Sequence, residues 1–526
     1  MATTATVSTP SSLSHRLIRR SELRVAYVLV TILTALVLMV HGYHPYAEDG
    51  GLYMAGVKRL LDPTLYPYGT AFVTEHLRFS LFAPMVAALV HWSHLTLPVV
   101  LLSLYLATVW LTLFAAYLLV ARCYDSPEAR IGACALLAMW ITLPIAGTSL
   151  MLMDPYVTAR SFSTPCVLLA LVGILDAFPL ARELNASRRR GWILCVGSLA
   201  CAAAMHPLMA AYGFGCVLVL SCMLSPTRWL RVGGTITLCL TALGVAAAIQ
   251  ALSPAESAIY VRVEMTRYYW FLGAWHWYEK IGLAAPLAIL AIVGFRTLRD
   301  RSAASVALAR MAVICGSVAA LVAMVFARQQ MATHLVARLQ PLRIFQVVYI
   351  VMILAVGSQL ARWVLQRSLL RGATAFVLLA GVMFSAERQT FPNSAHLEMP
   401  GTTPYNQWEQ AFLWVRQNTP KTALFALDAH YITSAGEDAQ CFRAIAERSA
   451  LPDYSKDGGE VSVTPALAAA WQIGETAQER INGKSDAQRM AALKPVKVNW
   501  IVLDEAAKTG FDCPYANATV KVCRLP

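Results

Sequence analysis

Two adjacent acids, Glu48 and Asp49, lie shortly after the first apolar segment of the chain, which runs from about residue 25 to residue 42. Acids held against a membrane are costly to desolvate and are usually retained for function. A short amphipathic helix is predicted directly after them, because Tyr53, Val57 and Leu60 share one helical face. The pattern predicts a carboxylate that accepts a proton at the membrane surface. A solvated acidic loop is the alternative.

Further polar residues are expected on the same side of the membrane as these acids. Carboxylates and arginines together suit a reaction in which a hydroxyl group is activated while an anionic phosphate departs. Each residue also has a simpler structural explanation, such as a turn, a helix break or a contact with lipid headgroups. The candidates are Asp154, Arg160, His206, Glu264, Arg338 and Arg343, and the aromatic run Tyr268-Tyr269-Trp270 lies near them in the sequence.

The composition is that of a membrane protein. Of 526 residues, 57% are apolar and only 14% are charged, whereas a soluble domain carries about 25% charged residues. The net charge of +13 is uneven, with +15 in residues 1–386 and −2 in residues 387–526. The basic excess therefore belongs to the membrane part, where it indicates orientation, and it does not form a nucleic-acid patch.

Eleven apolar segments of about 15–25 residues are interpreted as membrane spans, although several are shorter than the roughly 20 residues of a full crossing. The segment 81–92 is ambiguous, because it could be a further crossing or an interfacial helix. If it crosses, the arginine run at 188–190 faces outward, against the positive-inside rule. We therefore predict eleven spans, a cytoplasmic tail at residues 1–24 and a long outer loop at residues 43–96. The spans lie near 25–42, 97–120, 131–150, 163–181, 191–205, 207–224, 231–252, 280–296, 310–327, 343–361 and 370–386.

An odd number of spans places residues 387–526 outside the cell membrane. This tail has an ordinary soluble composition and predicts a small α/β domain, with a helix at 408–417. Short strands are expected at 423–427, 498–503 and 519–522. A disulfide between Cys513 and Cys523 is expected if the tail faces an oxidising compartment, which would leave Cys441 free. The prediction is an α-helical polytopic membrane protein with a small C-terminal α/β extracytoplasmic domain.

The chain resembles the GT-C superfamily of glycosyltransferases that use polyprenyl-phosphate sugars, which includes protein O-mannosyltransferases and aminoarabinose transferases. The resemblance rests on the acidic first outer loop, the helix beginning Asp-Gly-Gly-Leu-Tyr at residues 49–53, the second acid Asp154 after the third span, and the terminal outer domain. Gly50-Gly51 departs from the family, because many members carry a bulkier acidic or basic pair there. A WWD-type motif is absent from the tail, which argues against transfer to asparagine.

The resemblance implies a GT-C-like transmembrane domain at residues 25–386 and an inverting transfer of sugar from a lipid phosphate. Asp49 best fits the catalytic first-loop acid, with Tyr53 four residues on, and Glu48 is the alternative. Asp154 matches an acid that helps to bind the acceptor, or a divalent cation together with Asp49. The expected substrate-binding residues are Asp154, Arg160, His206, Tyr53 and Glu264, and the donor phosphate is assigned to Arg338 and Arg343.

The sequence thus predicts a glycosyltransferase in the inner membrane of a bacterium, with its C-terminus in the periplasm. Its expected partners are a polyprenyl-phosphate sugar donor, membrane lipids and a glycan, lipid or protein acceptor, but no nucleic acid. No cofactor is required beyond, at most, a divalent cation. One alternative is a transporter or flippase for a lipid-linked saccharide, which should show two related halves with broken helices. Another is a non-catalytic protein of envelope polysaccharide assembly.

Overall fold

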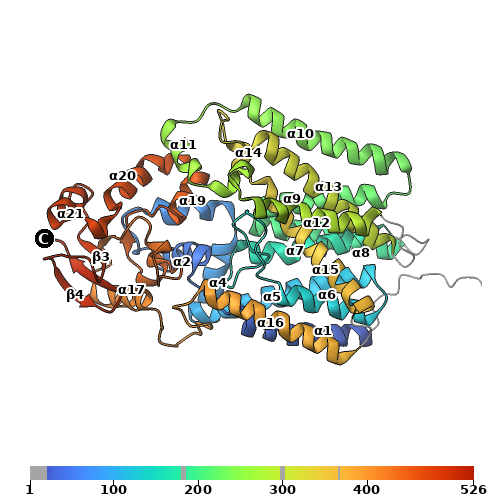
Figure 1. Ribbon diagram of the computed structural model, residues 1–526, viewed down its shortest axis with the longest axis horizontal. Coiled ribbons are helices and arrows are strands. Elements are labelled where there is room, and N and C mark those ends of the chain that lie inside the picture. The colour runs from blue at the N-terminus through green and yellow to red at the C-terminus, as the bar shows by residue number, and fades with distance from the viewer. Residues whose placement is uncertain (1–19, 179–184, 296–301, 365–367) are drawn as a thin grey trace, which may run out of the picture.

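The computed structural model describes residues 20–178, 185–295, 302–364 and 368–526, which Figure 1 shows as a ribbon. The predicted cytoplasmic tail therefore lies almost entirely outside the described residues, as do parts of three predicted inner loops. Helices form an elongated bundle at one end of the molecule (Figure 1). The C-terminal region, residues 387–526, carries the strands and forms the other end.

Long apolar helices make up the bundle. Among the described residues, nine helices are long and apolar enough to cross a membrane, as a polytopic membrane protein requires, since a helix satisfies its own backbone hydrogen bonds in lipid. The helices of the bundle are α1 (Arg20–His41), α4 (Phe82–Ser93), α5 (Leu97–Cys123), α6 (Pro127–Met139), α7 (Ala159–Ala177), α8 (Asn185–Met205), α9 (Pro207–Leu224), α10 (Thr235–Leu252), α12 (Trp277–Phe295), α13 (Ala303–Phe326), α15 (Phe345–Gln359) and α16 (Leu369–Thr390). Shorter helices lie in the connections, namely α2 (Glu48–Leu61), α3 (Ala71–Thr74), α11 (Ala258–Met265) and α14 (Leu335–Arg338).

Two of the predicted spans are not among the nine. The predicted span 131–150 is helical only as far as Met139, where α6 ends. Pro144 follows, and a proline cannot donate the backbone hydrogen bond that a continuing helix needs. Residues 140–158 instead fold back on themselves, with the backbone N–H of Leu152 donating to the carbonyl oxygen of Leu143 at 3.1 Å. The other span, 191–205, is part of α8, which begins with the exposed arginine run 188–190.

The ambiguous segment 81–92 forms the short helix α4. It has 12 residues, about 18 Å at the rise of an α-helix, which is too short to cross the hydrocarbon core alone. A bend of 99° separates it from the helical residues 71–79 before it. Its buried residues pack against α2 and α5.

Close helix contacts in the bundle depend on small residues. A Cβ atom added at Gly173 of α7 would lie 2.6 Å from the backbone nitrogen of Cys195 in α8, and Gly191 meets α7 in the same way. Small residues allow membrane helices to approach until their backbones touch. In contrast, α10 and α16 expose apolar side chains along opposite edges of the bundle (Figure 1), the surface that lipid would cover.

The C-terminal region contains one five-stranded sheet with the order β2-β1-β3-β5-β4. The first three strands in this order are parallel, whereas β5 is antiparallel to both β3 and β4. Both faces are buried, because alternate residues of β3 point to opposite sides: Val502 packs with Phe412 on one face, and Ile501 packs with Leu493 on the other. The strands are β1 (Leu424–Ala426), β2 (Ser449–Ala450), β3 (Trp500–Asp504), β4 (Asp512–Ala516) and β5 (Val520–Arg524), and the helices are α17 (Gln407–Asn418), α18 (Phe442–Ala446), α19 (Lys456–Val463), α20 (Ala468–Gln478) and α21 (Asp486–Leu493).

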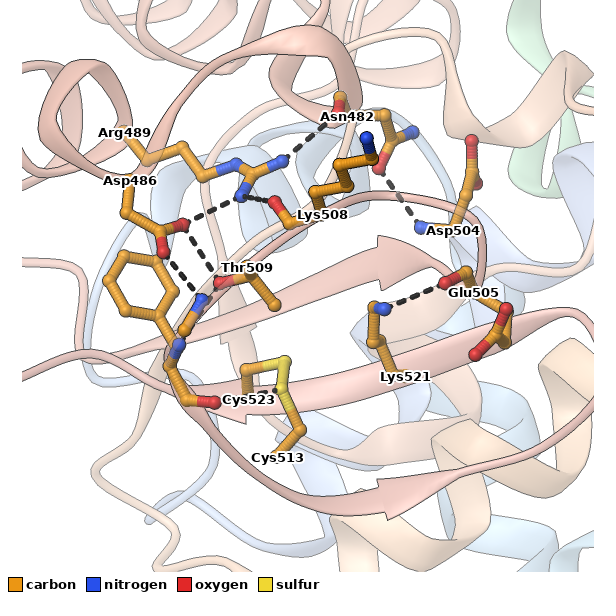
Figure 2. The surroundings of a disulfide bond; sticks show 12 residues. Asn482, Asp486, Arg489, Asp504, Glu505, Lys508, Thr509, Cys513, Lys521 and Cys523 are labelled. Carbon is orange, nitrogen blue, oxygen red and sulfur yellow. Dashed lines mark hydrogen bonds and ion pairs between the residues drawn. A yellow bond between two sulfur atoms is a disulfide. The ribbon is translucent and has the colours of Figure 1, made fainter.

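A disulfide joins Cys513 of β4 to Cys523 of β5 (Figure 2), as the sequence suggested. Cys441 is free and buried. Close to the disulfide, the fully buried guanidinium group of Arg489 donates to Asp486 at 2.8 Å and to the carbonyl oxygens of three other residues. A buried arginine is tolerated only when its donors are satisfied in this way. These contacts fix the outer edge of the C-terminal region.

Candidate functional site

A cavity of about 1140 Å³ lies where the bundle meets the C-terminal region. Eight of the nine predicted site residues line it, although they come from five separate segments of the chain. They are Glu48, Asp49, Tyr53, Asp154, Arg160, His206, Arg338 and Arg343. Glu264 does not line the cavity, because its side chain is fully buried beside Glu256 and His334. The predicted contact between Glu264 and substrate therefore has no support in the position of its side chain.

The two acids lie in the first turn of α2, whose backbone packs closely against the C-terminal region. Glu48 has a φ of +51°, which is uncommon for a residue with a side chain and is maintained only when its surroundings impose it. Its backbone N–H donates to the carbonyl oxygen of Ala439 at 2.8 Å. A Cβ atom at Gly51 would overlap the side chain of Cys441 and the carbonyl oxygen of Tyr46. Glycine in place of a bulkier residue thus lets the C-terminal region pack directly on the start of α2.

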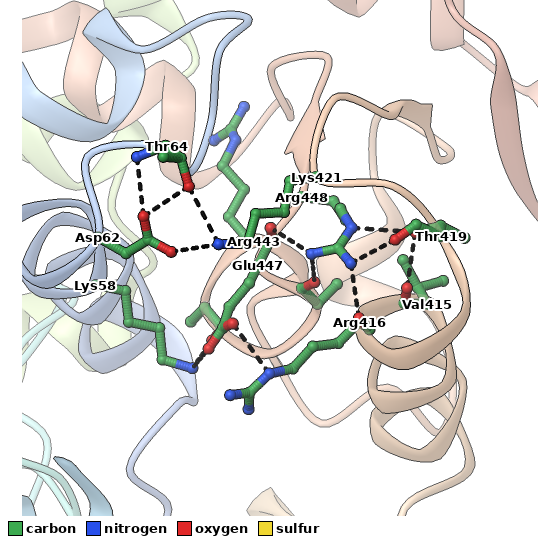
Figure 3. Close-up of polar contacts among 12 residues, drawn as sticks. Lys58, Asp62, Thr64, Val415, Arg416, Thr419, Lys421, Arg443, Glu447 and Arg448 are labelled. Atoms are coloured by element: carbon green, nitrogen blue, oxygen red, sulfur yellow. Dashed lines mark hydrogen bonds and ion pairs between the residues drawn. The ribbon is translucent and has the colours of Figure 1, made fainter. Parts of the chain in front are cut away.

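Ion pairs hold the other end of α2 against the C-terminal region (Figure 3). The Nζ atom of Lys58 donates to Glu447 at 2.8 Å and to the carbonyl oxygen of Ala444 at 2.6 Å. Near the end of the helix, Lys421 donates to Asp62 at 2.6 Å. The Lys58 side chain is 9% exposed and Glu447 is 16% exposed, so this pair is screened little by solvent. The helix that carries the acids is therefore fixed to the C-terminal region along its length.

Lys456 of α19 lies beside both acids. Its Nζ atom donates to Oδ1 of Asp49 at 2.9 Å and also pairs with Glu48. The two carboxylates remain accessible from the cavity, being 44% and 42% exposed. The positive charge of Lys456 lowers the pKa of Asp49 to about 2, with burial opposing the shift and Arg160 assisting it. Asp49 is consequently an ionised carboxylate at every physiological pH.

Asp154 and Arg160 form a second charged pair in the wall of the cavity. Asp154 lies in the loop 140–158, and Arg160 lies in the first turn of α7, where the two side chains are in direct contact. Both are buried. Burial raises the pKa of Asp154, and the adjacent guanidinium group opposes that rise. Asp154 thus pairs with Arg160, and Asp49 pairs with Lys456, so each of these acids has a cationic partner in the cavity wall.

Two arginines of the cavity have no carboxylate partner among the described residues. Arg338 donates to the hydroxyl oxygen of Tyr260 at 2.9 Å, and Arg343 donates through Nε to the amide oxygen of Gln340 at 2.7 Å. Gln340 has a φ of +50° and precedes Pro341, so the chain turns sharply between α14 and α15. This turn brings both arginines to the cavity. Arginines with unused donors suit the binding of phosphate oxygens.

His206 lies between α8 and α9 on another wall of the cavity. Its Nδ1 atom accepts a hydrogen bond from the backbone N–H of Met209 at 3.4 Å, which caps the start of α9. Burial lowers its pKa to about 3, and the charges of Arg343 and Arg160 add to this shift. The imidazole is therefore neutral at physiological pH. It can accept or donate a hydrogen bond to a substrate, but it adds no charge to the cavity.

The cavity also contains functional candidates that the sequence did not indicate. Lys456 and Glu460 both lie in α19, and His76, in the first outer loop, lies 3.2 Å from Glu460. The ring of His76 also packs edge-on against Tyr53. Lys456 and Glu460 escaped notice because the C-terminal region reads as an ordinary soluble domain. The spacing Lys456-x-x-x-Glu460, one helical turn, was the available signal, and it is common on solvated helices.

Comparison with protein-family models and with curated protein sequences finds no match to this chain. The functional conclusion therefore rests on the geometry of the cavity. That geometry offers the carboxylate of Asp49, which can accept a proton, and two arginines that can bind an anion. Its walls come from both the helical bundle and the C-terminal region.

Proposed function

We propose that this protein is a membrane glycosyltransferase of the GT-C type. It moves a sugar from a polyprenyl-phosphate donor to an acceptor hydroxyl group at the outer face of a bacterial inner membrane. The observation that carries the proposal is the meeting of Asp49 and Glu48 with Arg338 and Arg343 in one cavity at the end of the bundle. A base and an anion-binding group within one cavity are the minimum that this transfer requires.

In the proposed reaction the oxygen of the acceptor hydroxyl attacks the anomeric carbon of the sugar, and the bond from that carbon to the phosphate oxygen breaks. The hydroxyl proton passes to the carboxylate of Asp49, with Glu48 as the alternative, and the polyprenyl phosphate leaves with the bonding electrons. Arg338 and Arg343 stabilise the negative charge on the departing phosphate. Arg160, paired with Asp154, and the neutral His206 position the substrates.

The orientation of the chain is part of the proposal. The N-terminus would lie in the cytoplasm, and residues 387–526 would lie in the periplasm. The disulfide between Cys513 and Cys523 supports this orientation, because disulfides persist in the periplasm and are rare in the bacterial cytoplasm. A lipid-linked donor fits the same location, since the carrier lipid delivers the sugar to a compartment in which soluble nucleotide sugars are not expected.

The proposal is tested with the full-length protein in liposomes and a panel of short-chain polyprenyl phosphates that carry hexoses or amino sugars. Envelope glycan and lipid fractions serve as acceptors, and release of free polyprenyl phosphate is the readout. We expect release by the wild type and by the control Arg262→Gln, whose arginine is exposed on α11 outside the cavity. Asp49→Asn should release none.

Equal release by the wild type and by Asp49→Asn with every donor would reject a transfer reaction that depends on this carboxylate. Movement of an intact lipid-linked saccharide across the bilayer, without cleavage, would identify a transporter instead. A loss of envelope polysaccharide on deletion of residues 400–526, with Asp49→Asn silent, would identify a non-catalytic assembly protein.

A further inference from the structure

Three side chains that could bind a metal converge outside the cavity. The Nδ1 atom of His334 lies 2.7 Å from Oε2 of Glu256 and 3.0 Å from Oε2 of Glu264. One donor atom from each of the three residues lies within 4.8 Å of the others. The side chains of His334 and Glu264 are 1% and 0% exposed, so the cluster is a closed interior site.

The three residues come from two connections of the bundle, with Glu256 and Glu264 between α10 and α12 and His334 between α13 and α15. Glu256 follows α10, Glu264 is in the last turn of α11, and His334 precedes α14. Further hydrogen bonds hold two of the ligands in place. The backbone N–H of His334 donates to Glu256 at 3.0 Å, and the hydroxyl group of Thr333 donates to the other oxygen of Glu256 at 3.3 Å. Supporting hydrogen bonds of this kind orient the ligands of metal sites in proteins.

The tautomer of His334 leaves Nδ1 facing the carboxylates. The Nε2 atom lies 3.2 Å from the carbonyl oxygen of Gln329, which can only accept, so Nε2 carries a hydrogen. In a neutral imidazole the Nδ1 atom then has a lone pair, and here it points towards two carboxylate oxygens. This arrangement is repulsive unless a positive charge lies between the three atoms. A metal ion or a proton on Nδ1 can supply that charge.

Two observations favour a metal ion over a proton. First, the Oε1 atom of Glu264 is buried and has no hydrogen-bond partner among the described residues, and an unpaired buried carboxylate oxygen is costly. Second, with both glutamates ionised, a protonated His334 leaves one net negative charge in the cluster, whereas a divalent cation with a neutral imidazole and the same two carboxylates gives a net charge of zero. Buried charges are tolerated when they are balanced.

We propose that Glu256, Glu264 and His334 bind one divalent transition-metal ion, and that Zn²⁺ is the best match. One imidazole and two carboxylates form a nitrogen and oxygen donor set that suits zinc, whereas Mg²⁺ and Ca²⁺ prefer oxygen alone. Around a tetrahedral zinc ion the ligand atoms lie about 3.3 Å apart. The distances of 2.7 Å and 3.0 Å therefore need to lengthen by roughly half an ångström, which side-chain rotation alone provides.

The proposed metal site positions Arg338 and Tyr260, which lie next to it. Glu264 lies one helical turn after Tyr260 in α11, and the hydroxyl oxygen of Tyr260 accepts the hydrogen bond from Arg338. Arg338 lies four positions after His334, and its backbone N–H donates to the carbonyl oxygen of His334 at 2.8 Å. A metal ion that joins Glu264 to His334 thus fixes both the arginine and its hydrogen-bond partner.

Metal content is measured on the full-length protein, purified in detergent with a tag that contains no histidine, loaded with Zn²⁺ and then washed in metal-free buffer. We expect about one zinc ion per chain in the wild type. Glu264→Gln, which keeps the shape of the side chain, should weaken zinc binding roughly tenfold or more. Asp49→Asn is the matched control and should retain the metal, because its acid lies in the cavity.

A second measurement keeps the test decisive if Glu264→Gln does not fold. X-ray absorption at the zinc edge of the wild type should show one imidazole nitrogen at about 2.0–2.1 Å. A wild type that retains no zinc overturns the proposal, as does zinc that is lost in Asp49→Asn but kept in Glu264→Gln. In the first case His334 is an imidazolium held between two glutamates, and in the second the metal belongs to the cavity.

Discussion

The Nζ atom of Lys456 lies 2.9 Å from Oδ1 of Asp49, although the two residues are 407 positions apart in the chain. This contact makes the C-terminal region part of the candidate site rather than a separate domain attached to the membrane bundle. It also explains how two carboxylates can lie side by side at the start of α2 without strong repulsion, because one ammonium group neutralises part of their charge.

Asp49→Asn should abolish sugar transfer while the protein remains folded. The amide keeps the shape of the carboxylate but cannot accept a proton, and loss of a general base typically lowers the rate by about 10²–10⁴-fold. Lys456 keeps Glu48 as a partner, so no unpaired buried charge remains. The rate of polyprenyl phosphate release and the elution profile of the detergent-solubilised protein test this. Glu48→Gln is the companion variant, and its inactivity beside an active Asp49→Asn would transfer the role of base to Glu48.

Lys456→Gln should move the acidic limb of the pH–rate profile to higher pH. Lys456 is the largest cause of the low pKa of Asp49, so its removal raises that pKa and Asp49 becomes protonated at a higher pH. In the wild type the carboxylate loses its charge, and the contribution of the Lys456 pair to stability, only as the pH falls from about 4 towards about 2. The ratio kcat/KM is measured from pH 4 to pH 8. Lys421→Gln, which removes the ion pair to Asp62, should leave the profile unchanged, and coincident profiles for all three proteins would contradict the prediction.

Arg343→Gln should weaken productive binding of the donor. A hydrogen bond between charged groups contributes about 1.5–3 kcal/mol, so we expect kcat/KM for the donor to fall roughly 10- to 100-fold. The ratio kcat/KM for the acceptor, measured at a saturating donor concentration, should change much less. Arg343→Lys should recover part of the loss, because lysine keeps the charge but not the two parallel donors. Arg262→Gln serves as the control, and an equal loss in that variant would mean that Arg343 has no specific role.

Gly51→Ala should destabilise the protein. The added methyl group would overlap Cys441 and the carbonyl oxygen of Tyr46. Overpacking of this kind destabilises a protein by about 1–3 kcal/mol. This is more than the stabilisation that the higher helix propensity of alanine contributes. The thermal midpoint in detergent is the measurement. Gly215→Ala in α9 is the control, because nothing lies within 4 Å of its added Cβ atom. A midpoint for Gly51→Ala at or above that of the wild type would show that the C-terminal region does not pack on α2 as described.

An alkaline-phosphatase fusion after residue 390 should be active, and a green fluorescent reporter at the same position should be dark. Alkaline phosphatase is active only where its disulfides can form. The disulfide between Cys513 and Cys523 needs the same oxidising compartment. The opposite pattern would invert the proposed orientation of every span. Labelling of Cys513 and Cys523 with a thiol reagent, before and after reduction, provides a check that does not need a fusion partner.

Local patterns in the sequence predicted much of the fold. The helix expected at 408–417 is α17, and the strands expected at 423–427, 498–503 and 519–522 correspond to β1, β3 and β5. The strands β2 and β4 were not predicted; β2 has only two residues, and so short a run has no measurable alternation. The predicted span 131–150 was too long, since an apolar run does not show by itself where a proline ends the helix.

Residues of the candidate site could be predicted only where they are charged and the predicted topology assigns them to the same side of the membrane. Asp154 and Arg160 were selected because the predicted topology assigns both to the same outer turn, and the structure pairs them directly. Lys456 was not found, because no local pattern links a lysine in a soluble helix to an acid 407 residues earlier. Glu264 was expected at the same outer face as the other candidates, but sequence cannot tell whether a side chain points into a cavity or into the protein interior, where Glu264 lies.

The distance along the chain between Asp49 and Lys456 also determines when the cavity first exists during synthesis. A ribosome that adds about 5–20 residues per second needs roughly 20–80 s to make the 407 residues that separate them. During that interval α2 has neither its ammonium partner nor the surface on which it packs. The cavity is therefore completed only after every membrane helix has been made, so a nascent or truncated chain in the membrane has the acids but no closed site in which to use them.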